Sequence, residues 1–522
     1  MSSHSDRSRL AASEGPIAVP GTNAWCVAEA SRFAFLVDGA EYFRWLAASL
    51  PLARRNVWIV GWDFNPQIRL GPAGVDMPTL GEMLRALVEA HDGLHVNILV
   101  WAMGPLYSSK APATFSRSGW ADHPRIHLRF DARHPLRGAH HQKIVCIDDV
   151  LAFAGGIDLT TGRWDDRDHR AVSELRRTPA DIPYPPVHDI QAVMSGPAAR
   201  CLGEVARRRW RQATGKRIPA VEGAPEIWPE GLEPTLTGCP VAVARTEPKL
   251  FGRRGRREAI RLTKDALRSA RRSIYLEAQY LASFRVARIL AKRLAEPDGP
   301  EVVVFMTRNS RGLLEQFVMG HNRNRLIRRL KRADHAGRFA VMYPVVPDGE
   351  GGECEVLIHS KLIVVDDRFA RVGSSNLNNR SEGLDTECDV AVEARTDEQR
   401  AAIARLRDGL LAEHLDAAPE AVRDEVARTG SLVAAIQALN VHARGLRPFP
   451  IRAWQGKVTP LPFTGVLDPK EPYWPVQRLR WTLTGWAARL PLPRLSSLLA
   501  GLRRACSLTP SKGSAIASGR KK

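Results

Sequence analysis

The 522-residue sequence lacks the features of several protein classes. It has no run of about 20 apolar residues, the length that a membrane-spanning helix needs, and its first residues include no apolar segment of the kind that secretory signals contain. Its seven cysteines are scattered without a CxxC pair, which argues against a zinc ribbon or a disulfide framework and favours a reducing compartment. We therefore expect a cytoplasmic or peripheral membrane protein in which each cysteine is a small hydrophobic residue.

Negative charge is scarce relative to positive charge. Lys and Arg number 76 against 56 Asp and Glu, which gives a net charge of +20 and an isoelectric point near 10.1. Such a surface attracts phosphate groups, whether they belong to nucleic acid, to an anionic lipid surface or to a small substrate. Hydrophobic residues make up 44% of the chain and charged residues 25%, the balance of a folded globular protein, so wholesale disorder is excluded.

The chain contains an internal duplication. Three buried-strand patterns of the first half recur in the same order in the second half, at a nearly constant offset of about 210 residues: 56–63, 95–100 and 125–130, then 273–279, 302–305 and 339–343. This offset excludes a solenoid, whose period is about 20–50 residues. Strands that alternate with helical stretches in each half predict two similar α/β units.

The duplication divides the chain into five segments. We predict a flexible amino-terminal segment, a first catalytic half, a linker rich in Pro and Gly, a second catalytic half, and a helical or irregular extension with a basic tail; these cover 1–30, 31–215, 216–240, 241–415 and 416–522.

Each half also carries a dense polar motif. His141 and Lys143 are two residues apart in the first half, as are His359 and Lys361 in the second. On a strand this spacing points both side chains to one face, because strand side chains alternate. An imidazole and an ammonium group ahead of a glycine turn, with its backbone donors, suit a phosphate oxyanion.

The two motifs together would surround one pocket with two imidazoles and two ammonium groups. Phosphodiester chemistry needs a nucleophile on one side and an acid on the other, and histidine can fill either role because its unperturbed pKa is about 6.5. A single H-x-K pair carries little information, but packing does not explain twin copies that share their downstream residues. The catalytic signature is His141, Lys143, Asp148, His359, Lys361 and Asp366, followed in each half by Asp158 or Asn376.

These residues resemble the two signature motifs of the phospholipase D superfamily. The resemblance covers about 33–415, and segments such as 155–165 and 274–280 are most similar to the phosphatidylcholine-cleaving branch. It implies an α/β fold of two tandem phospholipase D-type sandwich units, related by pseudo-two-fold symmetry, with the active site at their interface.

The resemblance also implies a two-step displacement that needs no metal and no cofactor. His141 would attack phosphorus and form a phosphohistidine, a choice of nucleophile that is carried over from the family. His359 would protonate the leaving alcohol and then act as base toward water or a primary alcohol. The phosphate site would consist of Lys143, Lys361, Asn376 and Asp158.

Four acidic residues complete this interpretation. Position-matching with the family gives Glu387 as the carboxylate that orients His141, and Asp189 as the one that orients His359. Asp148 and Asp366 belong to the signature but follow the expected strands. We interpret them as structural, satisfying either a turn or a contact between the halves.

The leading hypothesis is a phospholipase D that converts phosphatidylcholine-like lipids to phosphatidate, with headgroup exchange to primary alcohols. The alternatives are a cardiolipin synthase-type phosphatidyltransferase, a nuclease of the superfamily and a non-catalytic lipid-binding protein. The missing amino-terminal membrane helices argue against a cardiolipin synthase. The presence of two motifs in one chain argues against a nuclease, and the intact motifs argue against a non-catalytic protein. The expected partners are a phospholipid membrane surface and the lipid and alcohol substrates; nucleic acid is not an expected partner, and the chain is expected to be a monomer.

Overall fold

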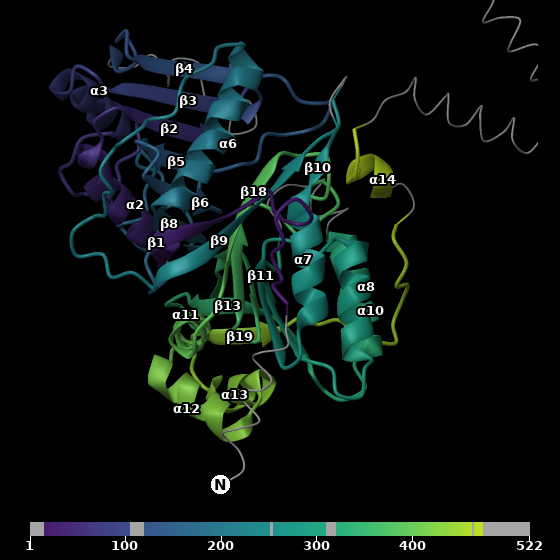
Figure 1. Cartoon of the computed structure of the whole chain (residues 1–522). Helices are drawn as coiled ribbons and strands as arrows, with labels where there is room; N and C mark the ends of the chain where they lie inside the picture. Colours follow the sequence, from purple (N-terminus) through teal and green to yellow (C-terminus); the bar gives the residue numbers. More distant parts are fainter. Residues whose placement is uncertain (1–14, 105–118, 251–253, 310–319, 462–463, 473–522) are drawn as a thin grey trace, which may run out of the picture. The chain divides into compact units, whose positions relative to one another are not determined.

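The structure, a computed structural model, describes residues 15–104, 119–250, 254–309, 320–461 and 464–472 (Figure 1). Helices and strands alternate through this part of the chain, which confirms the predicted α/β class. In the same ranges, no helix combines the length and the apolar character that crossing a bilayer requires. The two halves belong to one compact unit that extends to Pro472.

The first half forms a mixed sheet in the order β4-β3-β2-β5-β6-β8-β1. Strands β2, β3 and β4 are parallel, and the other neighbours are antiparallel. The bounds are β1 (Cys26–Val37), β2 (Asn56–Gly61), β3 (His95–Trp101), β4 (Ile126–Asp131), β5 (Ile144–Ile147), β6 (Leu151–Gly155) and β8 (Ile190–Ser195).

The second half repeats this order and these directions in β13-β12-β11-β16-β17-β18-β9. The two series meet at β1 and β9, which pair antiparallel from Cys26 opposite Val243 to Phe33 opposite Leu236. The duplication of the sequence is therefore a duplication of strand topology. The bounds are β9 (Leu236–Glu247), β11 (Ser273–Ala278), β12 (Glu301–Met306), β13 (Phe339–Pro347), β16 (Lys361–Val365), β17 (Phe369–Gly373) and β18 (Glu387–Glu393).

The central strands are buried on both faces, which explains their continuous apolar sequences. In β12, Val303 and Phe305 belong to the core that the two halves share, whereas Val302 and Val304 belong to the core beneath the helices of the second half. The shared core forms where β17 and β18 pack against β6 and β8. This packing brings the amino-terminal ends of the motif strands β5 and β16 to one region between the halves.

Helices cover the remaining faces. The outer core of the first half includes residues of α2 and α3, that of the second half includes residues of α7, α8 and α10 (Figure 1), and α6 and α11 contribute to the shared core. The bounds are α2 (Asp38–Ser49), α3 (Leu80–Ala90), α6 (Pro197–Thr214), α7 (Glu258–Ser269), α8 (Phe284–Leu294), α10 (His321–Ala333), α11 (Asp397–Leu415), α12 (Pro419–Thr429), α13 (Leu432–Leu439) and α14 (Thr464–Leu467). Shorter elements are η1 (Leu50–Leu52), β7 (Val187–His188), β10 (Arg256–Arg257), β14 (Glu353–Glu355), β15 (Leu357–Ile358) and β19 (Gly445–Pro448).

Two expected boundaries are corrected. The amino-terminal segment is not flexible through residue 30, since Ile17 is buried, its backbone N–H donates to Glu393 at 2.9 Å, and β1 already begins at Cys26. Strand β9 begins at Leu236, inside the predicted linker. The carboxy-terminal extension contains the helices α12 and α13, and its strand β19 pairs with β13. The end of the extension, 473–522 with the basic tail, lies outside the described residues.

The expectation for the cysteines is wrong at one pair. Cys26 on β1 and Cys201 on α6 are joined as a disulfide. Cys146, Cys239 and Cys388 are free and buried, as expected for small hydrophobic residues. The pair lies 175 residues apart in the sequence, so spacing alone did not reveal it.

Candidate active site

Both polar motifs lie where the halves meet. Strand β7 of the first half pairs in parallel with β15 of the second, and the N–H of His359 donates to the carbonyl of His188 at 2.7 Å. The N–H of His141 donates in turn to the carbonyl of Thr386 at 2.9 Å. The prediction that the motifs lie within strands holds only in part, because His141 precedes β5 whereas Lys361 begins β16. Each motif is thereby anchored to the opposite half.

The ring of His141 is held by acceptors of the second half. Its Nδ1 lies 3.0 Å from Oε2 of Glu387 and 3.0 Å from the carbonyl oxygen of Ser374. The carbonyl oxygen can only accept, so Nδ1 carries the hydrogen and Nε2 keeps a lone pair in the neutral ring. Burial, and then the ammonium groups of Lys143 and Lys361, hold the pKa of His141 well below its usual value. The neutral, nucleophilic form therefore prevails at neutral pH.

The ring of His359 has the mirrored arrangement. Its Nδ1 lies 2.6 Å from Oδ2 of Asp189, which the first half contributes. Burial and the charge of Lys361 hold the pKa of His359 well below its usual value. Burial by itself would raise the pKa of Asp189, but His359 and Lys361 lower it to about 2, so its carboxylate is ionised. The sequence-derived pairing of Asp189 with His359 and of Glu387 with His141 matches these contacts.

The two lysines are almost completely buried, at 3% and 1% exposure for Lys143 and Lys361. Nζ of Lys143 lies 2.9 Å from Oδ2 of Asp158. Nζ of Lys361 donates to the carbonyl of His359. Burial lowers the pKa of Lys361 to about 7. The carboxylate of Asp189 opposes this effect, and the charge of Lys143 adds to it. Since the charge of Lys143 acts on Lys361, the two motifs share one electrostatic environment.

One member of the predicted phosphate site, Asp158, has contacts that argue against its expected part. The carboxylate of Asp158 is occupied by Lys143 and by the backbone N–H of Trp62, which donates at 2.9 Å. A negative charge repels phosphate, so we assign Asp158 to holding Lys143 rather than to binding phosphate. Among the residues that the structure describes, the buried Oδ1 of Asn376 has no hydrogen-bond partner, and the backbone N–H of Asn376 donates to Ser381 at 3.1 Å. The part played by Asn376 stays a prediction.

The signature aspartates each organise a turn within their own half. Asp148 accepts the backbone N–H groups of residues 54, 55 and 56 at 2.7–2.8 Å, where the chain enters β2. Asp366 accepts those of residues 271, 272 and 273 at 2.7–2.8 Å, where it enters β11. They are structural residues of a turn, and the alternative of a contact between the halves does not apply.

Sequence reasoning missed three neighbours of the site. The hydroxyls of Ser374 and Ser381 donate to Glu387 at 2.5 and 2.6 Å, and so fix the carboxylate that holds His141. The two serines lie in the turns around Asn376, so their position in the sequence could have indicated that they lie near the site. Arg163 is the third, since its charge lowers the pKa of both His359 and Lys361. It lies in the segment 155–165 that carries the family resemblance, although no role was assigned to it there.

A buried charged network lies behind His359. In His188, Nδ1 lies 3.0 Å from Asp38 and 2.9 Å from Glu413, and Nε2 lies 3.0 Å from Glu277. Burial opposes a charge on this ring, but the three carboxylates raise the pKa of His188 well above its usual value. In the protonated ring Nε2 donates to Glu277, and Nδ1 lies at ion-pair distance from Asp38 and Glu413.

The same network contains residue types that can hold a metal ion. One ligand atom each from Asp38, His169, His188 and Glu413 lies within 4.8 Å of the others. His169 also contacts carboxylates through both nitrogens, at 2.8 Å to Asp165 and 3.1 Å to Glu413. Ion pairs with protonated rings account for these distances, and the expectation that no metal is needed stays a prediction.

The chain is similar to known lipid enzymes. A family model described as "Cardiolipin synthase, PLD-like domain" matches residues 263–406, which include the second motif. Phospholipase D2 of Bos taurus is 34% identical over 163 residues, 29% of this chain and 16% of that protein. Phospholipase D A of Dictyostelium discoideum is 23% identical over 407 residues, 66% of this chain and 31% of that protein. Human phospholipase D1 is 28% identical over 177 residues, 33% of this chain and 15% of that protein.

The chain thus spans less than a third of the length of these relatives. A solved structure, the phosphatidylserine synthase of Haemophilus influenzae, aligns with a TM-score of 0.49 at 13% identity, over 79% of this chain and 95% of that one. The match of the family model and the similarity to phospholipases D from animals and Dictyostelium place the chain in the phospholipase D superfamily.

Proposed function

We propose that the protein is a phospholipase D-type enzyme that hydrolyses glycerophospholipids to phosphatidate and the headgroup alcohol, and that also transfers the phosphatidyl group to primary alcohols. One observation carries the proposal: each motif histidine is held at Nδ1 by a carboxylate of the opposite half, so that both Nε2 atoms are available for chemistry. The similarity to curated phospholipases D supports the phospholipid substrate.

In the first step, Nε2 of His141 attacks phosphorus. A phosphorus–nitrogen bond forms, the phosphorus–oxygen bond to the headgroup breaks, and the headgroup oxygen takes a proton from Nε2 of His359. The negative phosphodiester raises the pKa of His359 on binding, which loads that ring with its proton. Lys143 and Lys361 stabilise the charge that grows on the non-bridging oxygens.

In the second step, water or an alcohol gives its proton to His359 and attacks phosphorus. The bond to His141 breaks, and phosphatidate or a new phosphatidyl ester leaves. All groups in this sequence are protein side chains, so the proposed reaction needs no cofactor. The proposed setting is a phospholipid membrane surface, with the chain acting as a monomer.

The second candidate is a phosphatidyltransferase whose acceptor is another lipid, as in cardiolipin synthesis. The description of the matching family model favours it, because that model is named for a cardiolipin synthase. The chemistry at phosphorus is the same in both candidates, and only the acceptor differs.

One assay tests the proposal. Purified protein is incubated with vesicles of phosphatidylcholine, phosphatidylglycerol or an equal mixture, with and without ethanol. We expect phosphatidate, and phosphatidylethanol when ethanol is present. Cardiolipin formed from phosphatidylglycerol would support the second candidate, and cleavage of single-stranded DNA without lipid turnover would contradict both. His141→Ala and His359→Ala should each abolish product formation while thermal unfolding stays unchanged.

A further inference from the structure

The loop that follows Asp158 joins the candidate active site to a neighbouring pocket. The N–H of Thr160 donates to the carbonyl of Asp158 at 2.9 Å, and its hydroxyl donates to Asp63 at 2.7 Å. Three residues further on, Arg163 lines the pocket. Residues 158–163 therefore lead directly from the partner of Lys143 to the pocket wall.

The protein holds this loop rigidly. The carbonyl oxygen of Arg163 lies 1.9 Å from where a Cβ of Gly39 would stand, so α2 and the loop can pack together only because residue 39 is glycine. Just beyond, Asp165 accepts from Arg176 at 2.8 Å and lies 2.8 Å from His169, all of them buried. The backbone that carries Arg163 is therefore preorganised.

Arg163 itself carries an uncompensated positive charge. It forms no ion pair with any residue in the part of the chain that the structure describes, and its Nε is buried without a hydrogen-bond partner. Its guanidinium acts on His359 and Lys361, which places the charge beside the catalytic groups. A half-buried guanidinium without a partner is costly, and an anionic ligand would offset that cost.

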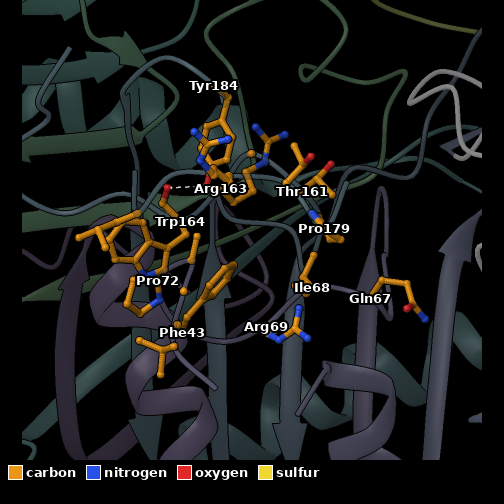
Figure 2. Close-up of a pocket in the computed structure, with 18 of the residues that line it drawn as sticks. Phe43, Gln67, Ile68, Arg69, Pro72, Thr161, Arg163, Trp164, Pro179 and Tyr184 are labelled. Carbon is orange, nitrogen blue, oxygen red and sulfur yellow. Dashed lines mark hydrogen bonds between the residues drawn. The ribbon is translucent and has the colours of Figure 1, made fainter. Parts of the chain in front are cut away.

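The pocket has a volume of about 410 Å³ (Figure 2). Its two other arginines are already engaged: Arg177 pairs with Glu174 at 2.7 Å and with Asp181 at 3.3 Å, and Arg69 donates to the carbonyl of Met77 at 2.9 Å. Of the three arginines, the side chain of Arg163 alone has no ion pair or hydrogen bond within the described part of the chain, and it stands on the loop that leads from Asp158.

The aromatic residues of the pocket do not form an open cage for a cation such as choline. Phe43 and Trp164 are only 2% and 8% exposed and belong to the core of the first half. The hydroxyl of Tyr184 donates to the carbonyl of Trp164 at 2.9 Å, the bond drawn in Figure 2. A cation–π cage requires several accessible ring faces. Phe43 and Trp164 offer none, and the half-buried Tyr184 is a single ring.

We propose that Arg163 and this pocket bind the alcohol that leaves or enters at His359, and that they select an alcohol carrying a carboxylate or phosphate group over a neutral or cationic one. This inference rests on the proposed function, which places the headgroup and the acceptor alcohol on the side of His359. It names the substrate class of the same site: alcohols of the size of serine or glycerol 3-phosphate that carry a carboxylate or phosphate group.

The test is a competition between acceptors, in which the lipid donor is constant. Protein is given neutral-detergent micelles of phosphatidyl-p-nitrophenol with equal concentrations of glycerol and glycerol 3-phosphate, and the two lipid products are quantified. The acceptors differ by one phosphate group. We expect the anionic acceptor to be favoured by about tenfold, the scale of one charge-assisted hydrogen bond. Serine against ethanolamine, tested in the same way, should favour serine.

Three variants complete the test. Arg163→Gln should reduce the product ratio to about one, Arg163→Lys should restore part of it, and the control Arg69→Gln should leave it unchanged. The ratio is internal, so a general loss of activity in a variant does not alter it, and thermal unfolding reports folding. A wild-type ratio near one, or a preference that survives in Arg163→Gln, overturns the inference while transfer itself upholds the proposed function. Absence of both p-nitrophenol release and lipid products overturns the proposed function and the inference with it.

Discussion

Asp189 and His359 lie 170 residues apart in the sequence, and the carboxylate of the first accepts a hydrogen bond from Nδ1 of the second at 2.6 Å. Asp189 belongs to the first half and His359 to the second. The reactive state of one motif is thus set by the other half.

Asp189→Asn should lower kcat by a factor of about 10² to 10⁴ and leave KM nearly unchanged. The amide cannot stabilise the protonated ring and can hold His359 in the wrong tautomer, so general acid catalysis is lost. Steady-state kinetics on a soluble lipid substrate measure this. Ser381→Ala is the milder comparison, because it removes one of two hydroxyls from Glu387. A kcat within threefold of wild type in Asp189→Asn would show that the pair does not take part in proton transfer.

Deprotonation of Lys361 should reduce activity as pH rises. Burial, with smaller effects from neighbouring charges, brings the pKa of its ammonium group down to about 7. The value of kcat/KM, which reports the free enzyme, should therefore fall as pH rises through about 7. In Lys361→Arg the guanidinium stays charged, so the residual activity should lack this alkaline limb. An unchanged limb in that variant would assign it to another group.

The buried ring of His169 should make stability depend on pH. Burial opposes its charge, but Asp38, Asp165 and Glu413 raise its pKa to about 9, above the unfolded value of about 6.5. The protonated ring therefore contributes about 3 kcal/mol to the free energy of unfolding. This contribution is complete below pH 6.5 and is lost as pH rises through about 9. Urea unfolding of wild type and His169→Gln between pH 6 and 9.5 measures this. The stability difference between the two proteins should shrink with rising pH, and a constant difference would refute the assignment.

Asp148→Ala should destabilise the fold by about 2–3 kcal/mol, because three backbone N–H groups lose their acceptor. The equivalent Asp366→Ala should cost less, since two of its three contacts are exposed to solvent. Urea unfolding gives both values. Folded Asp148→Ala should keep measurable turnover, whereas a folded but inactive variant would give Asp148 a chemical role that the geometry does not.

Much of this arrangement follows from the sequence by itself. The α/β class, the duplication and the two H-x-K motifs are encoded in residues close together along the chain, and strand and helix periodicities are local properties. The pairings of Glu387 and Asp189 with their histidines came from resemblance, because no local pattern links residues 246 or 170 positions apart.

Only the tertiary structure decided the rest. It paired Asp158 with Lys143, gave Asp148 and Asp366 turns within their own halves, and joined Cys26 to Cys201. It also left the guanidinium of Arg163 without an ion-pair partner in the described part of the chain, beside the catalytic groups. Such outcomes depend on which charged groups meet in a buried space, and that is determined when the two halves pack together, not by the order of residues within either one.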